Sequence, residues 1–413
     1  MPHYYIWTIG CQMNKAESER LGSLFEQHGY QATTTANEAD IIVLNSCVVR
    51  QSAEDKVTNK LDNLQVLKKQ RPNLTLALTG CLVDSNLAQL SKDFPYVDHF
   101  FKPGEIPLWL PGTQTTPQTQ DAPPAVYLPI IQGCDNFCSY CIVPYRRGRE
   151  RSRPIEELKN EVEDLVRRGA KEITLVGQNV DSYGHDLPGK PDLAGLLSEL
   201  NGIEGLARLR FLTNHPKDMT GRLIEAIASL DKVCEQFNLP IQSGDNDILK
   251  LMRRDYTVEH YHRLIAETRR RIPEISISTD IIVGFPSETE AQFQHTLDLL
   301  AELRFETVHV AAYSPRPGTI AARELEDNVP AAEKSRRLNQ IEKLQERIST
   351  EVNANLLGKT VEILVEGRKK GKWQGRTRSG KLVFFTDSSN WRGRLVNIRI
   401  EKAGAWSLQG SPS

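Results

Sequence analysis

Short apolar runs alternate with amphipathic segments over the first 110 residues. The apolar runs are 4–10, 39–46 and 74–80, and each ends in a small or polar residue. Runs of this length and boundary are typical of buried strands. Segments 14–28 and 52–70 between them have the period of helices. Because strands that alternate with helices form parallel sheets, we predict an α/β domain with a doubly wound parallel sheet over residues 1–110.

The same alternation resumes at Val126 and runs six times. Six βα units predict a central open (β/α)6 barrel, with its active residues at the carboxyl ends of the strands. A long charged amphipathic helix over 330–355 is expected to close this barrel. The expected strands are 126–132, 172–177, 208–213, 234–242, 275–284 and 307–314, and the expected helices include 155–168, 217–229, 258–271 and 288–303.

After Gly358 the pattern changes to short strands separated by glycines, over 359–367, 373–380, 381–387 and 392–404. This pattern predicts a small C-terminal β-barrel. A stretch rich in Pro, Thr and Gln has no periodicity and is expected to be a linker. The predicted divisions are an N-terminal domain 1–110, a linker 111–125, a core 126–353 and a C-terminal domain 354–413.

Composition narrows the class of protein. The chain has 413 residues, 39% hydrophobic and 25% charged, as in soluble globular proteins. It has no run of 18 apolar residues and no basic, then apolar, N-terminal segment, so neither a membrane span nor a signal peptide is expected. Seven cysteines without a secretion signal argue against a disulfide framework. We therefore expect a cytoplasmic protein, with thiolates available for metal.

Charge is distributed unevenly, although the net charge is only −1. Residues 355–413 carry 12 Lys and Arg against 4 Asp and Glu. A basic domain on an acidic body indicates a polyanionic partner, although an ordinary basic β domain would look the same. The residues expected to contact phosphates and stacked bases are Lys369, Lys370, Lys372, Arg376 and Arg378, with Trp373 beside them.

Three cysteines follow the first expected barrel strand at C-x3-C-x2-C spacing: Cys134, Cys138 and Cys141, here called the loop triplet. Three thiolates so arranged can hold three irons of an iron–sulfur cluster and leave the fourth open for S-adenosylmethionine. The alternative is structural zinc. Zinc needs four closed ligands, and no histidine lies between Val126 and Pro154 to complete the set.

Three further cysteines, Cys11, Cys47 and Cys81, follow the ends of the three N-terminal strands; we call them the strand-end triplet. In an open parallel sheet, ligands bind beyond the carboxyl ends of the strands. The topology therefore predicts that these thiols converge into a second metal site, although each alone could be a buried core thiol. Cys234 lies near the start of an expected strand and is interpreted as a core thiol.

Polar residues also gather in the loops after the barrel strands. We expect them to grip S-adenosylmethionine or a base, although turn chemistry alone would favour similar residues. The candidates are Gln178, Asn179, Asn214, His215, Gln242 and Ser243.

These motifs resemble the radical S-adenosylmethionine methylthiotransferases over essentially the whole chain. The matching text is GCQMN at Cys11, NSCVVRQSAEDK at Cys47, TGC at Cys81 and QGCDNFCSYCIVPYRRGRERSRP around the loop triplet. GCQMN, AEDK and PYRRGRERSR most resemble the branch that modifies isopentenylated adenosine in tRNA. Two departures from the family pattern, QSGDND and the Pro/Gln-rich linker, do not involve an expected cluster ligand.

The resemblance implies a mechanism and partners. It implies two 4Fe–4S clusters, one on each triplet, with Tyr140 near the adenine of S-adenosylmethionine. It implies hydrogen abstraction from carbon 2 of the base beside the anticodon, followed by sulfur insertion and methylation from a second S-adenosylmethionine. The implied partners are tRNA bound by a C-terminal TRAM domain, an electron donor of the flavodoxin or ferredoxin type and a sulfur donor, but no membrane. The alternatives are a methylthiotransferase for threonylcarbamoyl-adenosine or a ribosomal protein, and a non-catalytic Fe–S RNA-binding protein.

Overall fold

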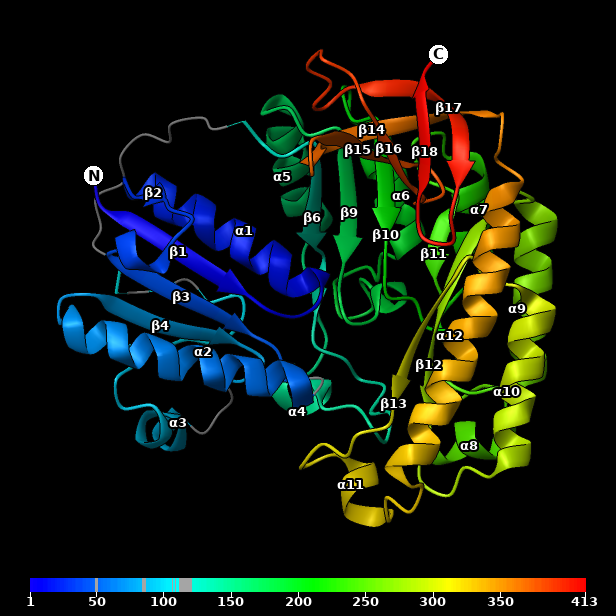
Figure 1. Ribbon diagram of the computed structural model, residues 1–413, viewed down its shortest axis with the longest axis horizontal. Coiled ribbons are helices and arrows are strands. Elements are labelled where there is room, and N and C mark those ends of the chain that lie inside the picture. The colour runs from blue at the N-terminus through cyan, green and yellow to red at the C-terminus, as the bar shows by residue number, and fades with distance from the viewer. Residues whose placement is uncertain (49–50, 84–86, 106, 108, 111–120) are drawn as a thin grey trace.

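The computed structural model describes residues 1–48, 51–83, 87–105, 107, 109–110 and 121–413, and has an α/β fold (Figure 1). Most of the predicted linker, residues 111–120, lies outside the described residues. Within the described residues, no helix is long and apolar enough to cross a membrane.

The N-terminal sheet has the order β2-β1-β3-β4-β5, and its strands are parallel. The central strand β3 is buried along its whole length because a helix covers each face of the sheet. Phe25 of α1 packs with Ile41 on one face, and Leu61 of α2 packs with Leu44 on the other. The doubly wound prediction is therefore confirmed. The elements are β1 (His3–Thr8), α1 (Gln12–Gln27), β2 (Gln31–Ala32), η1 (Ala36–Glu38), β3 (Ile41–Ser46), α2 (Gln51–Gln70), β4 (Thr75–Gly80), α3 (Leu87–Asp93) and β5 (His99–Phe100).

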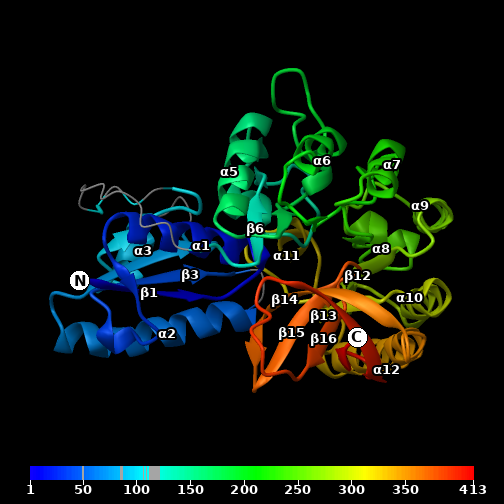
Figure 2. The same cartoon turned by 90° about the horizontal axis from the view of Figure 1, so that it is seen from above.

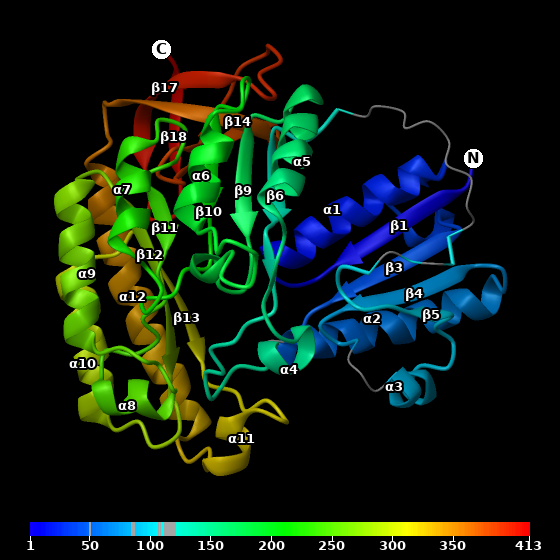
Figure 3. The ribbon, with the colours of Figure 1, turned by 180° about the vertical axis from the view of Figure 1, so that it is seen from behind.

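The central domain is an open barrel of six parallel strands within the continuously described part of the chain, as predicted. Two three-stranded sheets, β6-β9-β10 and β11-β12-β13, are joined by a bridge between Leu209 and Val233. Seen from behind, helices α6, α7, α9 and α10 cover the outside of the strands (Figure 3). The strands are β6 (Ala125–Pro129), β9 (Glu172–Val176), β10 (Arg208–Phe211), β11 (Gln236–Asn238), β12 (Ser276–Val283) and β13 (Thr307–Ala312).

Strand β11 covers only Gln236–Asn238 and is therefore much shorter than the predicted strand 234–242. Pro240 follows and has no N–H to donate to a ladder, and Gln242 has a left-handed backbone with φ 73°. The remaining elements of this domain are β7 (Ile131–Gln132), α4 (Val143–Arg147), β8 (Arg151–Ser152), α5 (Ile155–Arg167), η2 (Val180–Ser182), α6 (Leu193–Asn201), α7 (Gly221–Ser229), α8 (Asn246–Leu251), α9 (Val258–Arg271), α10 (Glu290–Leu303), α11 (Ile320–Glu324) and α12 (Ala331–Ala354).

The C-terminal domain is a closed five-stranded barrel with the order β14-β15-β16-β18-β17. Its core includes Ile363, Trp373, Phe385 and Ile398. The last strand was not predicted, because its sequence, LQGSP, lacks alternating apolar residues. The strands are β14 (Thr360–Lys369), β15 (Lys372–Thr377), β16 (Leu382–Phe385), β17 (Leu395–Ala403) and β18 (Leu408–Pro412).

Two buried arginines of β10 fasten the C-terminal barrel to the central one. Arg208 donates from Nη1 to the carbonyl of Arg376 at 2.8 Å, and Arg210 donates from Nη2 to the carbonyl of Thr377 at 2.6 Å. Seen from above, the N-terminal domain lies beside β6, with α1 towards the barrel (Figure 2). Met13 of α1 packs there against Tyr127 and Val176. The three domains thus meet around the inside of the central barrel.

Candidate active site: two cysteine triplets and a central cavity

The loop triplet lies between β7 and α4, beyond the first barrel strand. All three residues are free thiols, and the backbone N–H of Cys141 donates to the carbonyl of Cys138 at 3.0 Å. Burial, together with the charges of Cys138 and Cys134 nearby, raises the pKa of Cys141 to about 12. Burial likewise raises the pKa of Cys134 to about 11. The three thiols are therefore close together, and metal binding there has to release protons.

Backbone geometry fixes the start of this loop. Gly133 has φ 84°, and a Cβ there would lie 2.1 Å from the carbonyl oxygen of Arg149, so only glycine fits. Its N–H donates to Oε1 of Gln178 at 2.7 Å. Gln178, expected to contact a cofactor or base, thus holds the cysteine loop in position with this oxygen.

A buried arginine donates to one sulfur of the loop triplet. Arg254 donates from Nη1 to Sγ of Cys138 at 3.3 Å, from Nε to the hydroxyl of Tyr256 at 2.8 Å, and from Nη2 to the carbonyl of Pro240 at 3.0 Å. A charged donor of this kind stabilises negative charge on sulfur. Tyr140 lies at the triplet and packs edge-on against Phe285, with ring centroids 6.5 Å apart. Sequence reasoning missed Arg254, because nothing in its spacing distinguishes it from other arginines.

The strand-end triplet also converges. Cys47 and Cys81 directly follow β3 and β4, and Cys11 is the N-cap of α1. Burial raises the pKa of Cys81 to about 11, and charges on Cys47 and Cys11 contribute to the rise. Glycines allow this approach: a Cβ on Gly10 would lie 2.9 Å from the Cβ of Cys47, and one on Gly80 would lie 2.3 Å from the carbonyl oxygen of Ser46.

Arg147 connects the segment that carries the loop triplet with the strand-end triplet. It lies on α4, shortly after Cys141, yet its Nε donates to Sγ of Cys81 at 3.3 Å. Its Nη1 pairs with Glu17 at 2.6 Å, and its side chain is only 2% exposed. Nη2 donates to Oδ1 of Asn14 at 3.4 Å, and that oxygen also accepts from Sγ of Cys11 at 3.2 Å. The central domain therefore supplies a cation to the strand-end triplet.

The chemistry of the two donor sets fits iron–sulfur clusters. Among the described residues, which include all seven cysteines, the only group of three or more His, Cys, Asp or Glu close enough to hold a single metal ion is Asp135, Glu150 and His185, and it contains no cysteine. A structural zinc site takes four closed ligands, whereas each triplet offers three free thiols. An iron–sulfur cluster binds each thiolate through a different iron. Both donor sets therefore match such a cluster in the number and kind of their ligands.

A polar network lies at the carboxyl ends of β9 and β10. Asn214 donates from Nδ2 to Asp181 at 2.5 Å, the backbone N–H of His215 donates to the same carboxylate at 2.9 Å, and Asn179 donates to Asp218 at 2.7 Å. The side-chain oxygens of Asn179 and Asn214 are buried and accept no hydrogen bond among the described residues. Buried oxygens of this kind need a partner, and a bound ligand would supply one.

Electrostatics and strain distinguish the segments that follow β10 and β11. Burial, and then the charge of Arg254, lowers the pKa of His215 to about 2, so its ring is neutral. Thr213 and Gln242 have left-handed φ angles of 77° and 73°. Such strain in residues other than glycine costs about 1–3 kcal/mol and gathers at functional sites. Ser243 is fully buried, and its hydroxyl accepts from the N–H of Asp245 at 3.3 Å.

A cavity of about 1200 Å³ lies where the three domains meet, and we call it the central cavity. Cys11 and Cys47 line it, whereas Cys134, Cys138 and Cys141 do not. A second hollow of about 700 Å³, between α5 and α6, contains none of the candidate residues. The polar lining of the central cavity from the barrel strands includes Glu172, Thr174, Arg210, Gln236, Asn238, Ser278, Asp280 and His309, and the C-terminal barrel adds Arg376, Lys381, Arg392 and Trp406.

Family models match all three parts of the chain. Residues 3–102 match uncharacterized protein family UPF0004, residues 128–300 match the radical SAM superfamily, and residues 355–412 match the TRAM domain. Radical SAM proteins use S-adenosylmethionine and a 4Fe–4S cluster, which fits the loop triplet.

Two full-length relatives decide the family. A tRNA-2-methylthio-N(6)-dimethylallyladenosine synthase of Dehalococcoides mccartyi is 54% identical over 99% of this chain and 98% of its own length. A protein of the same name from Chloroflexus aurantiacus is 49% identical over 99% of this chain and 91% of its own length. The chain belongs to this methylthiotransferase family. The resemblance seen in the sequence is thus confirmed.

A solved structure supports the fold of this methylthiotransferase. The radical S-adenosylmethionine methyltransferase TsrM from Kitasatospora setae superposes with a TM-score of 0.55 at 14% identity, covering 78% of this chain and 77% of its own. At this identity the likeness concerns the fold alone.

The C-terminal barrel of the methylthiotransferase differs from the expectation at two residues. Trp373 is 6% exposed and packs in the core, so it cannot stack on a base. Arg378 pairs with Glu235 of the central barrel at 2.7 Å, so it fastens domains together. Lys369, Lys370 and Lys372 are exposed as expected. Sequence reasoning missed Trp406, which is 61% exposed. The only sign of its exposure in the sequence is a large apolar side chain within a short stretch of glycine and polar residues, GAWSLQG.

Proposed function

We propose that the protein converts carbon 2 of N6-dimethylallyladenosine in tRNA from C–H to C–SCH3, using S-adenosylmethionine. The observation that carries this proposal is the presence of two cysteine triplets, of which the strand-end triplet is contacted by Arg147 of the central domain and lines the central cavity. The relatives named above carry the name of this reaction. That name favours dimethylallyladenosine over threonylcarbamoyl-adenosine or a ribosomal protein.

The loop triplet is proposed to hold one four-iron cluster. When bound, the cluster would supply the electron that cleaves S-adenosylmethionine reductively to methionine and a 5′-deoxyadenosyl radical. Arg254 holds Cys138, and Gln178 holds the loop at Gly133. The free amide oxygens of Asn179 and Asn214 offer acceptors to S-adenosylmethionine, whereas neutral His215 adds no positive charge beside its sulfonium.

The strand-end triplet is proposed to hold a second four-iron cluster. When bound, it would supply the sulfur for the new bond to carbon 2. The hydrogen of carbon 2 would leave as part of 5′-deoxyadenosine, and the methyl group would come from a second S-adenosylmethionine, which leaves as S-adenosylhomocysteine. Cys11 and Cys47 line the central cavity, so this sulfur would face a base held there. Arg147 keeps Cys81 in place from the neighbouring domain. An external sulfur donor and a reductant of the flavodoxin or ferredoxin type would replenish the sulfur and the electrons.

The central cavity is proposed to receive the target base. Ligand pockets commonly occupy about 300–1000 Å³, so a cavity of about 1200 Å³ has room for an extruded nucleoside. Its polar barrel lining suits the edges of a base. The exposed Lys369, Lys370 and Lys372 would contact phosphates of the tRNA.

The test is a reaction under anaerobic conditions with reconstituted protein, S-adenosylmethionine and dithionite. Three tRNA preparations carry dimethylallyladenosine, threonylcarbamoyl-adenosine or unmodified adenosine beside the anticodon. Mass spectrometry of the nucleosides should find the methylthio product only in the first. Equal modification of the second would change the substrate assignment. RNA binding without 5′-deoxyadenosine would favour the non-catalytic Fe–S protein.

A further inference from the structure

Trp406 lies in the loop between β17 and β18 and is 61% exposed. A single exposed apolar side chain is ordinary on a protein surface, so exposure alone means little. Its position is more informative, because Trp406 lines the central cavity that also contains Cys11 and Cys47. A flat aromatic side chain therefore stands on the wall of the proposed base site.

The turn that carries Trp406 is held from behind. The N–H of Gly404 donates to the carbonyl of Ser407 at 3.0 Å. Asn353, buried at the end of α12, donates from Nδ2 to the carbonyls of Gly404 at 2.9 Å and Ala405 at 3.1 Å. Lys381 in turn donates to Oδ1 of Asn353 at 2.8 Å. Because the backbone is already fixed, a ligand that packs on Trp406 loses little free energy to ordering the turn.

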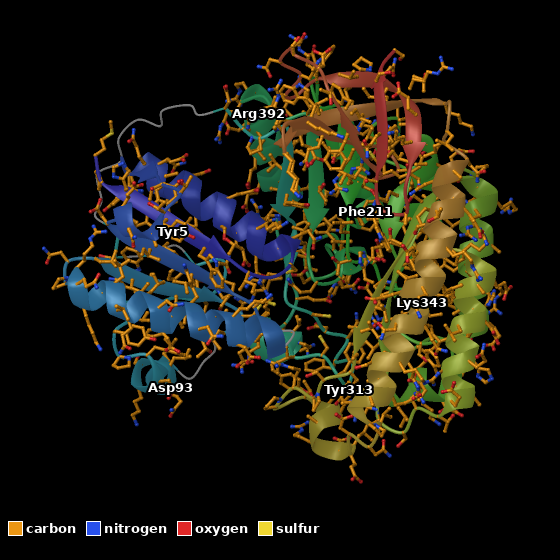
Figure 4. All side chains as sticks on the ribbon, viewed as in Figure 1. Tyr5, Asp93, Phe211, Tyr313, Lys343 and Arg392 are labelled. Carbon is orange, nitrogen blue, oxygen red and sulfur yellow. The ribbon has the colours of Figure 1, made fainter. Side chains whose placement is uncertain are left out.

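The cavity that Trp406 lines has six basic side chains against four acidic ones, a balance that suits a nucleic acid. Arg392 and Arg376 are among the basic ones, and both are exposed. Figure 4 shows Arg392 on the side of the C-terminal barrel that faces the N-terminal domain. A base seated against an aromatic ring, with its phosphate near an arginine, is the usual arrangement for single-stranded nucleic acids.

We propose that Trp406 stacks on an unpaired nucleobase of the RNA loop that neighbours the target base, and that Arg392 contacts the phosphate of that nucleotide. The inference rests on the proposed function and adds a recognition site to it. By stacking on this neighbouring base, Trp406 would keep the RNA loop in an open conformation beside the cavity. The target base would then stay extruded into the cavity. A paired duplex cannot offer such a base, because its bases are already stacked.

The test measures binding of the full-length, reconstituted protein to a fluorescent RNA hairpin with the anticodon loop sequence. Stacking on an aromatic residue contributes about 1–3 kcal/mol per base, so Trp406→Ala should weaken binding roughly 5- to 150-fold. Trp406→Phe should retain most of the affinity, because a flat ring remains. Leu395→Ala is the matched control: Leu395 is 42% exposed on the same barrel but does not line the central cavity.

Two further readouts separate stacking from charge. Trp406→Ala should leave the salt dependence of binding unchanged, whereas Arg392→Ala should reduce the slope of log affinity against log salt by about 1. Binding to a fully paired RNA of equal length should be insensitive to Trp406→Ala.

Unchanged hairpin affinity in Trp406→Ala, or an equal loss for hairpin and duplex, would overturn the inference. A change of oligomeric state in the free Trp406→Ala variant would do so too, because it would assign the side chain to contact between protein chains. If the intact protein binds no hairpin, the proposed tRNA substrate fails as well. If it binds and methylthiolates RNA while Trp406→Ala behaves identically, only this inference fails.

Discussion

The two cysteine triplets form the same kind of site by opposite routes. The loop triplet spans residues 134–141, and one turn of chain brings its thiols together. The strand-end triplet spans residues 11–81, and its thiols meet only because three parallel strands end at one edge of a sheet. A local site of this kind can exist wherever its loop is held, whereas a topological one depends on the whole domain.

The triplets share one device, a buried arginine 3.3 Å from a sulfur, but its origin differs. Arg254 and Cys138 belong to the same domain, and Arg254 also bonds Tyr256 and Pro240 there. Arg147 belongs to the central domain and reaches Cys81 of the N-terminal one. The strand-end site is thus completed by its neighbour. Docking of the two domains and assembly of this site are coupled.

The largest expected effect separates the roles of the triplets. Cys138→Ala should abolish both 5′-deoxyadenosine and the methylthio-nucleoside, because the radical site loses one of three thiolates. Cys47→Ala should abolish only the methylthio-nucleoside, since the loop triplet keeps its own ligands. Both products are measured by mass spectrometry after reaction with dithionite. The iron content of each variant is measured as well, and it should fall from about eight to about four per chain.

Cys234→Ala is the matched control for these variants. Cys234 is fully buried before β11, as expected of a core thiol, so this variant should keep all its iron and lose only about 1 kcal/mol of stability. Circular dichroism must first show that each variant is folded. Sulfur insertion by Cys47→Ala would contradict the assignment of roles.

The next largest effect is a change in the midpoint potential of each cluster when its buried arginine is replaced. It is measured in the cysteine variants, because each of them keeps only one cluster. With Cys138→Ala, only the strand-end cluster remains, and adding Arg147→Met should shift its midpoint potential to more negative values. The reason is that the reduced cluster carries more negative charge and loses a buried cation. With Cys47→Ala, Arg254→Met should shift the loop cluster in the same direction.

In the control variants, each arginine is replaced while only the cluster of the other triplet remains. The midpoint potentials are measured by electron paramagnetic resonance. Arg147→Met should leave the loop cluster unchanged, because Arg147 donates to Cys81 and not to that triplet. Glu17 loses its buried partner in this variant, so Arg147→Met with Glu17→Gln tests whether an altered potential is only a folding defect. A shift in both clusters from either arginine would contradict the pairing.

A smaller effect should come from the glycines beside the cysteines. Gly80→Ala and Gly133→Ala each combine a left-handed backbone with a clash, against the backbone of Ser46 or Arg149, and should lower iron at their own triplet only. Gly189→Ala is the control, because φ is 75° but no atom lies within 4 Å of the added Cβ. It should cost about 1 kcal/mol and no iron. Iron loss from Gly189→Ala would mean that backbone strain, not the clash, disrupts the site.

Pattern and spacing predicted the architecture and the loop triplet, because strand periodicity and the spacing of Cys134, Cys138 and Cys141 are local features of the sequence. The strand-end triplet followed from the predicted parallel sheet, whose strands end at one edge. Pattern and spacing did not predict which of several similar side chains makes a given contact in the folded protein. PYRRGRERSR contains several arginines, and only the fold directs Arg147 to Cys81. The basic cluster suggested Trp373 as a stacking residue, yet alternation along β15 turns that ring into the core. The polar loop makes Gln178 a candidate for binding a cofactor or a base, yet its side-chain oxygen accepts a hydrogen bond from the N–H of Gly133.

The smallest effect should be a pH dependence of stability that belongs to the loop-triplet side of the barrel. Burial raises the pKa of Asp181 from 3.8 to about 7, against the hydrogen bonds from His215 and Asn214. Between roughly pH 4 and 7 the folded protein holds a proton on Asp181 that the unfolded chain has released, so the contribution of this group to stability falls as pH rises through this window. This group contributes a slope of at most about 1.4 kcal/mol per pH unit. Asp181→Asn should remove that slope, and Cys47→Ala should keep it. Urea unfolding followed by circular dichroism between pH 5 and 8 measures it, and parallel curves for the intact protein and Asp181→Asn would show that Asp181 is ionised throughout.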